Sequence, residues 1–180
     1  MAEQALVIES AIQGEVEVVP TPWGPVSVTV AGDRSLTPLL TYHDVGVNHQ
    51  GCFQQLMTAS SHLSLLVRNF CFYHVDAPGC EAGGEFTPKD KKALDAENLA
   101  EQVSEVIRHL KLRDVVGFGV GMGGYVLASF AARYPKDMVG LILASPLCTR
   151  PGWWEWGFGK KAAYHLWMEG WTPSAMKHLT

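Results

Sequence analysis

The stretch that most constrains the fold is VVGFGVGMGGYVLASFAARYP, residues 115–135. It begins with a short apolar run typical of a buried strand and continues into a turn packed with glycine. Its last part is amphipathic with a helical period, which Pro135 ends. A strand, a tight turn and a helix in direct succession predict an α/β domain whose functional loops leave the carboxyl ends of parallel strands. The glycine turn is therefore the first place to look for a function.

The segments before this turn predict an antiparallel start and then parallel strands. Apolar and polar residues alternate on both sides of a Pro/Gly break over residues 15–31, which predicts a hairpin. PLLTYHDVG (residues 38–46) and FCFYHVDAPG (residues 70–79) are short apolar runs that end in polar loops, as buried parallel strands do. A helix is predicted between them, from about Phe53 to Arg68.

The remaining elements follow in alternation. Apolar residues recur at helical spacing after Asp95, a plausible N-cap residue, and this helix leads into a strand over residues 115–118. After the glycine turn and its helix, MVGLILASP (residues 138–146) predicts another buried strand. No internal repeat interrupts this order.

One interpretation of the glycine turn is a dinucleotide site. GVGMGG, residues 119–124, satisfies the pattern G-x-G-x-x-G between a strand and a helix. Such a site also needs an acidic residue about 20 positions later, at the end of the next strand. Here that strand ends in LILASPLC, which has no carboxylate, and the turn follows several earlier strands. Nucleotide binding is therefore the less favoured interpretation.

The same turn also fits the nucleophile elbow G-x-S-x-G, with Gly119 first, Gly123 last and Gly121 at the serine position. The antiparallel start and the polar loop after the first parallel strand agree with an α/β-hydrolase fold. Glycine carries no hydroxyl, so acyl transfer through Gly121 is impossible. The positions that resemble an oxyanion loop are His43, Asp44, Val45 and Gly46.

Five segments together resemble the N-myc downstream-regulated (NDRG) family, in its plant branch of NDRG-like and pollen-specific proteins. They are TYHDVGVNHQGCFQ, HVDAPGCEAG, the stretch over residues 115–135, VGLILAS and GWWEWGFGK. The resemblance covers nearly everything after about Leu36. It implies an α/β-hydrolase fold without hydrolase activity, a cytoplasmic location and a role in signalling, growth and stress responses. For plant members it also implies association with heterotrimeric G-protein βγ subunits.

The resemblance predicts one incomplete α/β-hydrolase-like domain. We expect an N-terminal hairpin over residues 1–35, a sheet core with a degenerate elbow over residues 36–146, and the start of a cap over residues 147–180. The fold of the family continues beyond the cap into strands that would carry a triad acid and histidine, whereas this chain stops at Thr180. We therefore expect a chain truncated in the cap region.

Composition narrows the classes of partner and compartment. The net charge is -4 and no basic tract is present, so a nucleic-acid partner is not expected. The apolar runs have the length of strands, and the N-terminal stretch lacks the basic and apolar regions of a secretory signal. No cofactor is expected. The four cysteines lack the spacing of a zinc site, so we expect free thiols at Cys52, Cys71, Cys80 and Cys148.

Histidine and aspartate residues at the predicted loops suggest a second kind of function. His43, Asp44, His49, His74 and Asp76 would be candidate metal ligands if these loops converge. Their spacing matches no zinc pattern, and polar side chains at strand ends commonly bond to backbone groups in turns. Structural roles are therefore favoured, and the alternative is a hydrolase-like enzyme with metal- or water-based chemistry.

The segment GWWEWGFGKKAAYHLWMEGW, residues 152–171, holds five of the six tryptophans. The favoured interpretation is a cap whose aromatic side chains pack over the sheet. An interfacial membrane contact is the other interpretation, because tryptophan beside lysine suits the headgroup boundary. If the rings are exposed, Trp153, Trp154 and Trp156 are the candidate surface for a protein partner.

Overall fold

A computed structural model of the 180-residue chain describes residues 11–59, 63–84 and 96–146. The chain divides into two units, Met1–Leu147 and Cys148–Thr180. All of the second unit lies outside the described residues, and with it the expected cap and its tryptophans.

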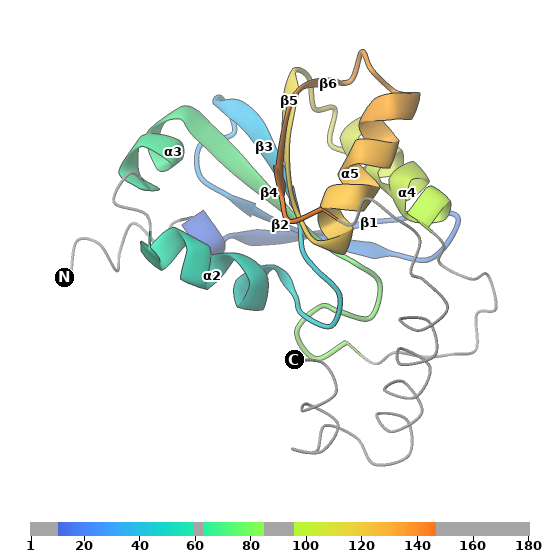
Figure 1. Cartoon of the computed structure of the whole chain (residues 1–180), viewed down its shortest axis with the longest axis horizontal. Helices are drawn as coiled ribbons and strands as arrows, with labels where there is room; N and C mark the ends of the chain where they lie inside the picture. The colour runs from blue at the N-terminus through green and yellow to red at the C-terminus, as the bar shows by residue number, and fades with distance from the viewer. Residues whose placement is uncertain (1–10, 60–62, 85–95, 147–180) are drawn as a thin grey trace. The chain divides into compact units, whose positions relative to one another are not determined.

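The first unit is built on a sheet of six strands in the order β1-β2-β4-β3-β5-β6 (Figure 1). The strands are β1 (Glu15–Val19), β2 (Val26–Ala31), β3 (Thr37–Tyr42), β4 (Phe70–Asp76), β5 (Val115–Val120) and β6 (Met138–Ala144).

The strands β1 and β2 form the predicted hairpin, with Glu15 opposite Val30 and Val19 opposite Val26. Strand β2 continues antiparallel to β4, and β4, β3, β5 and β6 are mutually parallel. The carboxyl ends of β3, β4 and β5 therefore lie at one edge of the sheet, where the loops after them meet. The antiparallel start and the parallel core predicted from the sequence are confirmed.

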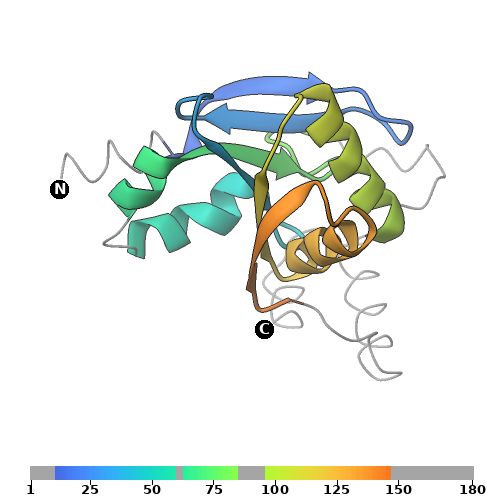
Figure 2. The same cartoon turned by 90° about the horizontal axis from the view of Figure 1, so that it is seen from above.

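Four described helices cover the two faces of the sheet (Figure 2). The helices α4 and α5 lie on one face, and α2 and α3 lie on the other. Their bounds are α2 (His49–Ala59), α3 (Leu63–Asn69), α4 (Ala96–His109) and α5 (Met122–Arg133).

The predicted helix from about Phe53 to Arg68 is wrong in its start. The structure has two helices in this region, and the first begins at His49. The reason is a cap: the Asn48 Oδ1 accepts the N–H of Gly51 at 2.9 Å, which satisfies an amide group of the first helical turn.

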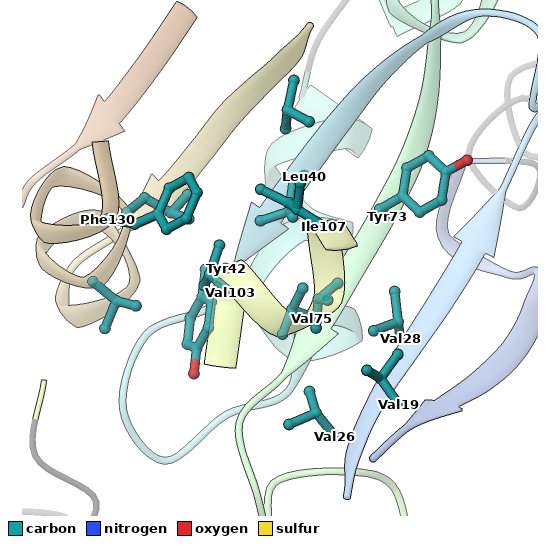
Figure 3. Packing of buried hydrophobic residues seen from close by; sticks show 14 of the residues in the cluster. Val19, Val26, Val28, Leu40, Tyr42, Tyr73, Val75, Val103, Ile107 and Phe130 are labelled. Carbon is teal, nitrogen blue, oxygen red and sulfur yellow. The ribbon is translucent and has the colours of Figure 1, made fainter. Parts of the chain in front are cut away.

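The larger hydrophobic core lies between the sheet and the helices α4 and α5 (Figure 3). Val103 and Ile107 of α4 and Phe130 of α5 pack there against Leu40 and Val75 of the sheet. These side chains recur at helical spacing along α4 and α5, as predicted. Since burial of each such side chain contributes about 1.5–3 kcal/mol, this packing holds α5 against the sheet.

A smaller core lies on the opposite face, where Phe53 of α2 packs against Phe72 of β4 and Leu39 of β3. Cys52, Cys71 and Cys80 are free thiols, and Cys148 lies outside the described residues. Burial raises the pKa of the Cys71 thiol, which makes it a poor nucleophile at neutral pH.

Candidate functional site

The glycine turn between β5 and α5 has the backbone of a sharp strand-to-helix elbow. Gly121 has a φ of 54° and a ψ of -117°, in the region that side-chain-bearing residues rarely adopt. Its N–H donates to the Ala144 carbonyl at 3.0 Å, which links the turn to the end of β6. A nucleophile elbow holds its central residue in such a conformation, which strains a serine but which glycine adopts without strain.

The two outer glycines of the elbow let α5 approach the sheet. A Cβ atom on Gly119 would lie 2.6 Å from the Gly123 carbonyl oxygen. A Cβ on Gly123 would lie 2.2 Å from the carbonyl oxygen of Tyr42 in β3. Both distances are too short for any side chain. The pattern G-x-x-x-G is therefore needed for packing between strand and helix at this point.

The carboxylate of Asp44 lies at the amino end of α5. Asp44 follows β3 in the loop that leads to α2, and its Oδ1 accepts the N–H of Met122 at 2.9 Å. The same oxygen accepts the N–H of Val45 at 2.8 Å. Met122 follows the nucleophile position, and Val45 belongs to the loop after β3. These are the two places from which an α/β-hydrolase draws its oxyanion-hole donors.

Asp44 also fills the space that a nucleophile would need. A Cβ atom on Gly121 would lie 2.2 Å from both Cγ and Oδ1 of Asp44. The amino end of α5 carries partial positive charge and unpaired N–H groups, so a carboxylate is favourable there. Since Gly121 offers no side chain to cap the helix, Asp44 supplies the cap from a distant part of the chain.

His43 holds the backbone of this loop. Its ring is 1% exposed, its Nδ1–H donates to the Asp44 carbonyl at 2.7 Å, and its Nε2 accepts the N–H of Ala77 at 2.9 Å. Both ring nitrogens are therefore used by the neutral imidazole. Burial lowers the pKa of His43, which keeps this form at neutral pH.

Val45 and Gly46 make the turn beyond His43 and Asp44. The Val45 side chain is exposed, and Gly46 has a φ of 76°. Of the four positions predicted to resemble an oxyanion loop, Asp44 bonds to the first residue of α5, and the Val45 N–H bonds to Asp44. His43 supports the loop backbone, and Gly46 has the positive φ that its turn requires.

The other predicted residues gather at the end of β4. The buried Asp76 carboxylate accepts the backbone N–H of His49 at 2.8 Å and the Nδ1–H of the same residue at 2.8 Å. His74 accepts the Thr41 hydroxyl at Nδ1, at 2.6 Å, and donates from Nε2 to the Ala11 carbonyl at 2.7 Å. Burial lowers the pKa of His74 to about 4.

These bonds leave little capacity to hold a metal ion. His43 and His74 each use both ring nitrogens within the protein. Within the described ranges, no group of three or more histidine, cysteine, aspartate or glutamate residues is placed to hold a metal. The convergence of the predicted loops did occur, but it produced a hydrogen-bonded network.

Sequence reasoning placed Asp44 and Gly121 in the correct loops but missed their contact. The bond between Asp44 and Met122 joins residues 78 positions apart, and no local pattern encodes it. Trp153, Trp154 and Trp156, predicted as a partner surface, lie outside the described residues. In the part of the chain that the structure describes, no helix is long and apolar enough to cross a membrane.

An antiparallel hairpin, a parallel core and a glycine elbow facing the loop after β3 define the class: this is an α/β-hydrolase-like fold. Solved structures agree. The esterase from Exiguobacterium antarcticum superposes with a TM-score of 0.69 at 19% identity, over 92% of this chain and 60% of the esterase. At that identity the likeness shows the fold alone.

The chain belongs to the Ndr family, whose family model matches residues 16–180. It is 43% identical over 147 residues to Protein NDL1 of Arabidopsis thaliana, which covers 82% of this chain and 42% of that protein. It is 38% identical over 157 residues to the pollen-specific protein SF21 of Helianthus annuus, over 87% of this chain and 45% of that protein. The chain thus spans less than half the length of these relatives, and the predicted resemblance is confirmed.

Proposed function

We propose that this chain is a non-enzymatic NDRG-like protein that acts by binding other proteins. The observation that carries the proposal is the bond set of Asp44. One carboxylate oxygen accepts the N–H groups of Met122 and Val45, both at oxyanion-hole positions, while the nucleophile position is Gly121.

Ester hydrolysis needs those two amides for another purpose. In an active hydrolase they stabilise the negative oxygen of the tetrahedral intermediate, and loss of a single such donor lowers kcat by about 100- to 1,000-fold. Here a substrate oxygen would have to displace the Asp44 carboxylate and develop its charge beside it. The two amides at the elbow therefore stabilise the folded structure through Asp44 rather than the negative oxygen of a transition state.

A fluorophosphonate probe tests the absence of serine-hydrolase chemistry. We expect no covalent labelling of the 180-residue chain under conditions that label an active esterase completely. The same preparation should not hydrolyse nitrophenyl esters above the buffer rate. Labelling of a serine near the elbow would overturn the proposal.

Family membership supports a wider role in signal transduction, growth or stress response in the cytoplasm. A heterotrimeric G-protein βγ dimer is the proposed partner, and Trp153, Trp154 and Trp156 are the proposed contact residues. These aromatic residues, next to basic ones, belong to types enriched in binding hot spots.

Purified βγ dimer tests this partner directly. Binding to the immobilised chain should weaken when Trp153 and Trp154 are both changed to Ala, while far-ultraviolet circular dichroism stays nearly unchanged. Absence of binding by the unaltered chain would exclude this partner. Binding that persists in the folded double variant would place the interface elsewhere.

The second candidate is a hydrolase-like enzyme with metal- or water-based chemistry. It is favoured by the buried histidine and aspartate network at the ends of β3 and β4, where His43 directly precedes Asp44, the residue that bonds to Met122 of the elbow. Ester turnover that appears with added divalent metal, and that a chelator abolishes, would support this candidate over the first. Asp76→Asn should then abolish turnover as well.

A further inference from the structure

The loop that follows β4, residues 77–84, has one hydrogen bond to the rest of the described chain. The Ala77 N–H donates to the Nε2 of His43 at 2.9 Å. The two other backbone hydrogen bonds of the loop join residues within it. Ala77 and Cys80 also contact the larger hydrophobic core. The polar attachment of this loop therefore depends on one histidine nitrogen.

His43 accepts this bond only while its Nε2 carries no proton. Its Nδ1 lies 2.7 Å from the Asp44 carbonyl oxygen, which can only accept, so Nδ1 carries the ring proton. Nε2 therefore presents its lone pair to the Ala77 N–H. A second proton on the ring would place one N–H against another, and two donors cannot bond to each other.

A protonated Nε2 has another partner close by. The Oδ1 of Asp76 lies 3.9 Å from Nε2, and the two side chains are only 4% and 1% exposed. Opposite charges at such depth attract each other strongly, because little water screens them. The Nδ1–H bond to Asp44 is kept, since the charged ring retains that proton. Protonation thus exchanges Ala77 for Asp76 and leaves the loop after β3 in place.

Among the described residues, the charged and titratable groups that act on this ring are Asp44 from the loop after β3, Asp76 from β4 and His49 from α2. Burial is the largest effect and lowers the pKa of His43 from 6.5, although the bond to the Asp44 carbonyl and the Asp76 charge oppose it. The neighbouring Tyr42 ring stays neutral, because burial raises its pKa. Release of the loop would relieve part of this burial, so proton binding favours the released form as the pH falls below 6.5.

We propose that His43 is an acid-sensitive switch for the loop of residues 77–84. A proton from solvent binds to Nε2, the bond to Ala77 breaks and the loop is released, while Asp44 stays bonded to Nδ1–H. Glu81 and Ala82 of this loop line a pocket of about 380 Å³ beside β1, β2 and the start of α2. Release therefore opens one wall of that pocket. The switch does not involve the chemistry of the elbow, so it is independent of the proposed function.

Amide hydrogen exchange in the full 180-residue chain tests this coupling. NMR gives protection factors, which are corrected for the intrinsic pH dependence of exchange. The protection of the Ala77 amide should fall below pH 6.5 by up to about tenfold per pH unit, as expected for one coupled proton. The amides of Val45 and Met122 should keep their protection, because Asp44 accepts both and is not released.

Two variants of His43 separate its two bonds. In His43→Gln the side-chain oxygen can still accept the Ala77 N–H but does not titrate, so the protection of Ala77 should lose most of its pH dependence. In His43→Asn the shorter side chain reaches only the Asp44 carbonyl, so Ala77 should lose protection already at neutral pH. His109→Gln is the matched control, because His109 is an exposed histidine on α4, and it should behave as the unaltered chain.

Constant protection of Ala77 from neutral pH to about pH 5 would overturn the proposal. So would an equal loss at Ala77 and Met122, which would indicate unfolding of the whole described domain. Undiminished pH dependence in His43→Gln would assign the effect to another group. The comparison of Ala77 with Met122 in the unaltered chain needs no substitution, so it decides the proposal even if both His43 variants fail to fold.

Discussion

At the scale of single residues, Asp44 and Gly121 depend on each other. The carboxylate can reach the amino end of α5 only because position 121 has no side chain. A serine introduced there would have to enter a backbone region with positive φ and would meet the Asp44 carboxylate within 2.4 Å. The glycine thus serves the folded structure as well as removing the nucleophile.

Gly121→Ser should therefore lower the free energy of unfolding and give no esterase activity. We expect a loss of about 2–4 kcal/mol, from backbone strain together with the clash. Urea denaturation and nitrophenyl acetate turnover measure the two effects. The double variant Asp44→Gly with Gly121→Ser should recover part of the stability. Measurable turnover by the single variant would contradict the account of the elbow.

Removal of the Asp44 carboxylate should lower the free energy of unfolding, because its two hydrogen bonds are lost. Asp44→Ala leaves the N–H groups of Met122 and Val45 without their acceptor, and we expect a loss of about 1–3 kcal/mol. Asp44→Asn keeps one acceptor oxygen and should lose less than half as much. Equal stability of the alanine and asparagine variants in urea denaturation would show that the bonds to these amides contribute little.

His74 should make stability depend on pH in the acidic range. Burial lowers its pKa from 6.5 in the unfolded chain to about 4 in the fold, so between these values the unfolded state binds more protons. Its contribution is fully present above pH 6.5 and is lost as the pH falls toward 4. The loss from this residue is about 3 kcal/mol over that interval.

Two measurements check this behaviour. The free energy of unfolding should fall between pH 6.5 and 4, and His74→Gln should flatten the fall without abolishing it, because burial also lowers the pKa of His43. The ring resonances of His74 should not titrate until well below pH 6. A titration of His74 near pH 6.5 would be inconsistent with its burial and its bonds to Thr41 and Ala11.

At the scale of elements, the close packing of α5 against the sheet depends on Gly123, the last glycine of the predicted elbow. A Cβ on Gly123 would lie 2.2 Å from the Tyr42 carbonyl oxygen, which belongs to the sheet backbone and cannot move aside. On strand β6, a Cβ on Gly140 would lie 3.6 Å from the side chain of Val116 in β5, which is an ordinary van der Waals contact.

Gly123→Ala should consequently destabilise the protein by about 2–4 kcal/mol or prevent folding, whereas Gly140→Ala should change stability by less than about 1 kcal/mol. Thermal unfolding followed by circular dichroism compares the two. Because both variants add one methyl group next to the same sheet, a similar effect from each would argue against close approach of α5 as the reason for Gly123.

The order of elements was predictable because it depends on local periodicity and turn residues. The hairpin, the parallel strands and the helices α4 and α5 follow from patterns within about 20 residues. The helix α2 begins at His49, before the predicted start near Phe53, although Asn48 is a favoured N-cap residue. The bond between Asp44 and Met122 was beyond such reasoning, since only the finished sheet brings β3 and β5 together.

At the scale of the whole molecule, the two ends of the sheet differ. Strand β1 is the edge strand at one end, where Val16 and Val18 are each 60% exposed. They alternate there with Glu15 and Glu17, whose carboxylates pair with Arg34, and such charges on an edge oppose pairing with another chain. Strand β6 forms the other end of the described sheet and pairs there with β5. Val139, Ile142 and Leu143 of β6 are 61%, 49% and 39% exposed.

An edge strand with unpaired backbone groups and exposed apolar side chains favours pairing with another chain. We therefore expect the 180-residue chain to associate as its concentration rises, and we expect β6 to be the cause.

Changing both Val139 and Ile142 to Lys should shift the chain toward the monomer in sedimentation velocity, because charges on an edge strand oppose further pairing. Leu65→Lys is the matched control: Leu65 is 55% exposed but lies on the helix α3, so its substitution should leave association unchanged. A chain that is monomeric across the micromolar range, or one that responds equally to Leu65→Lys, would exclude the edge of β6 as the surface that drives association.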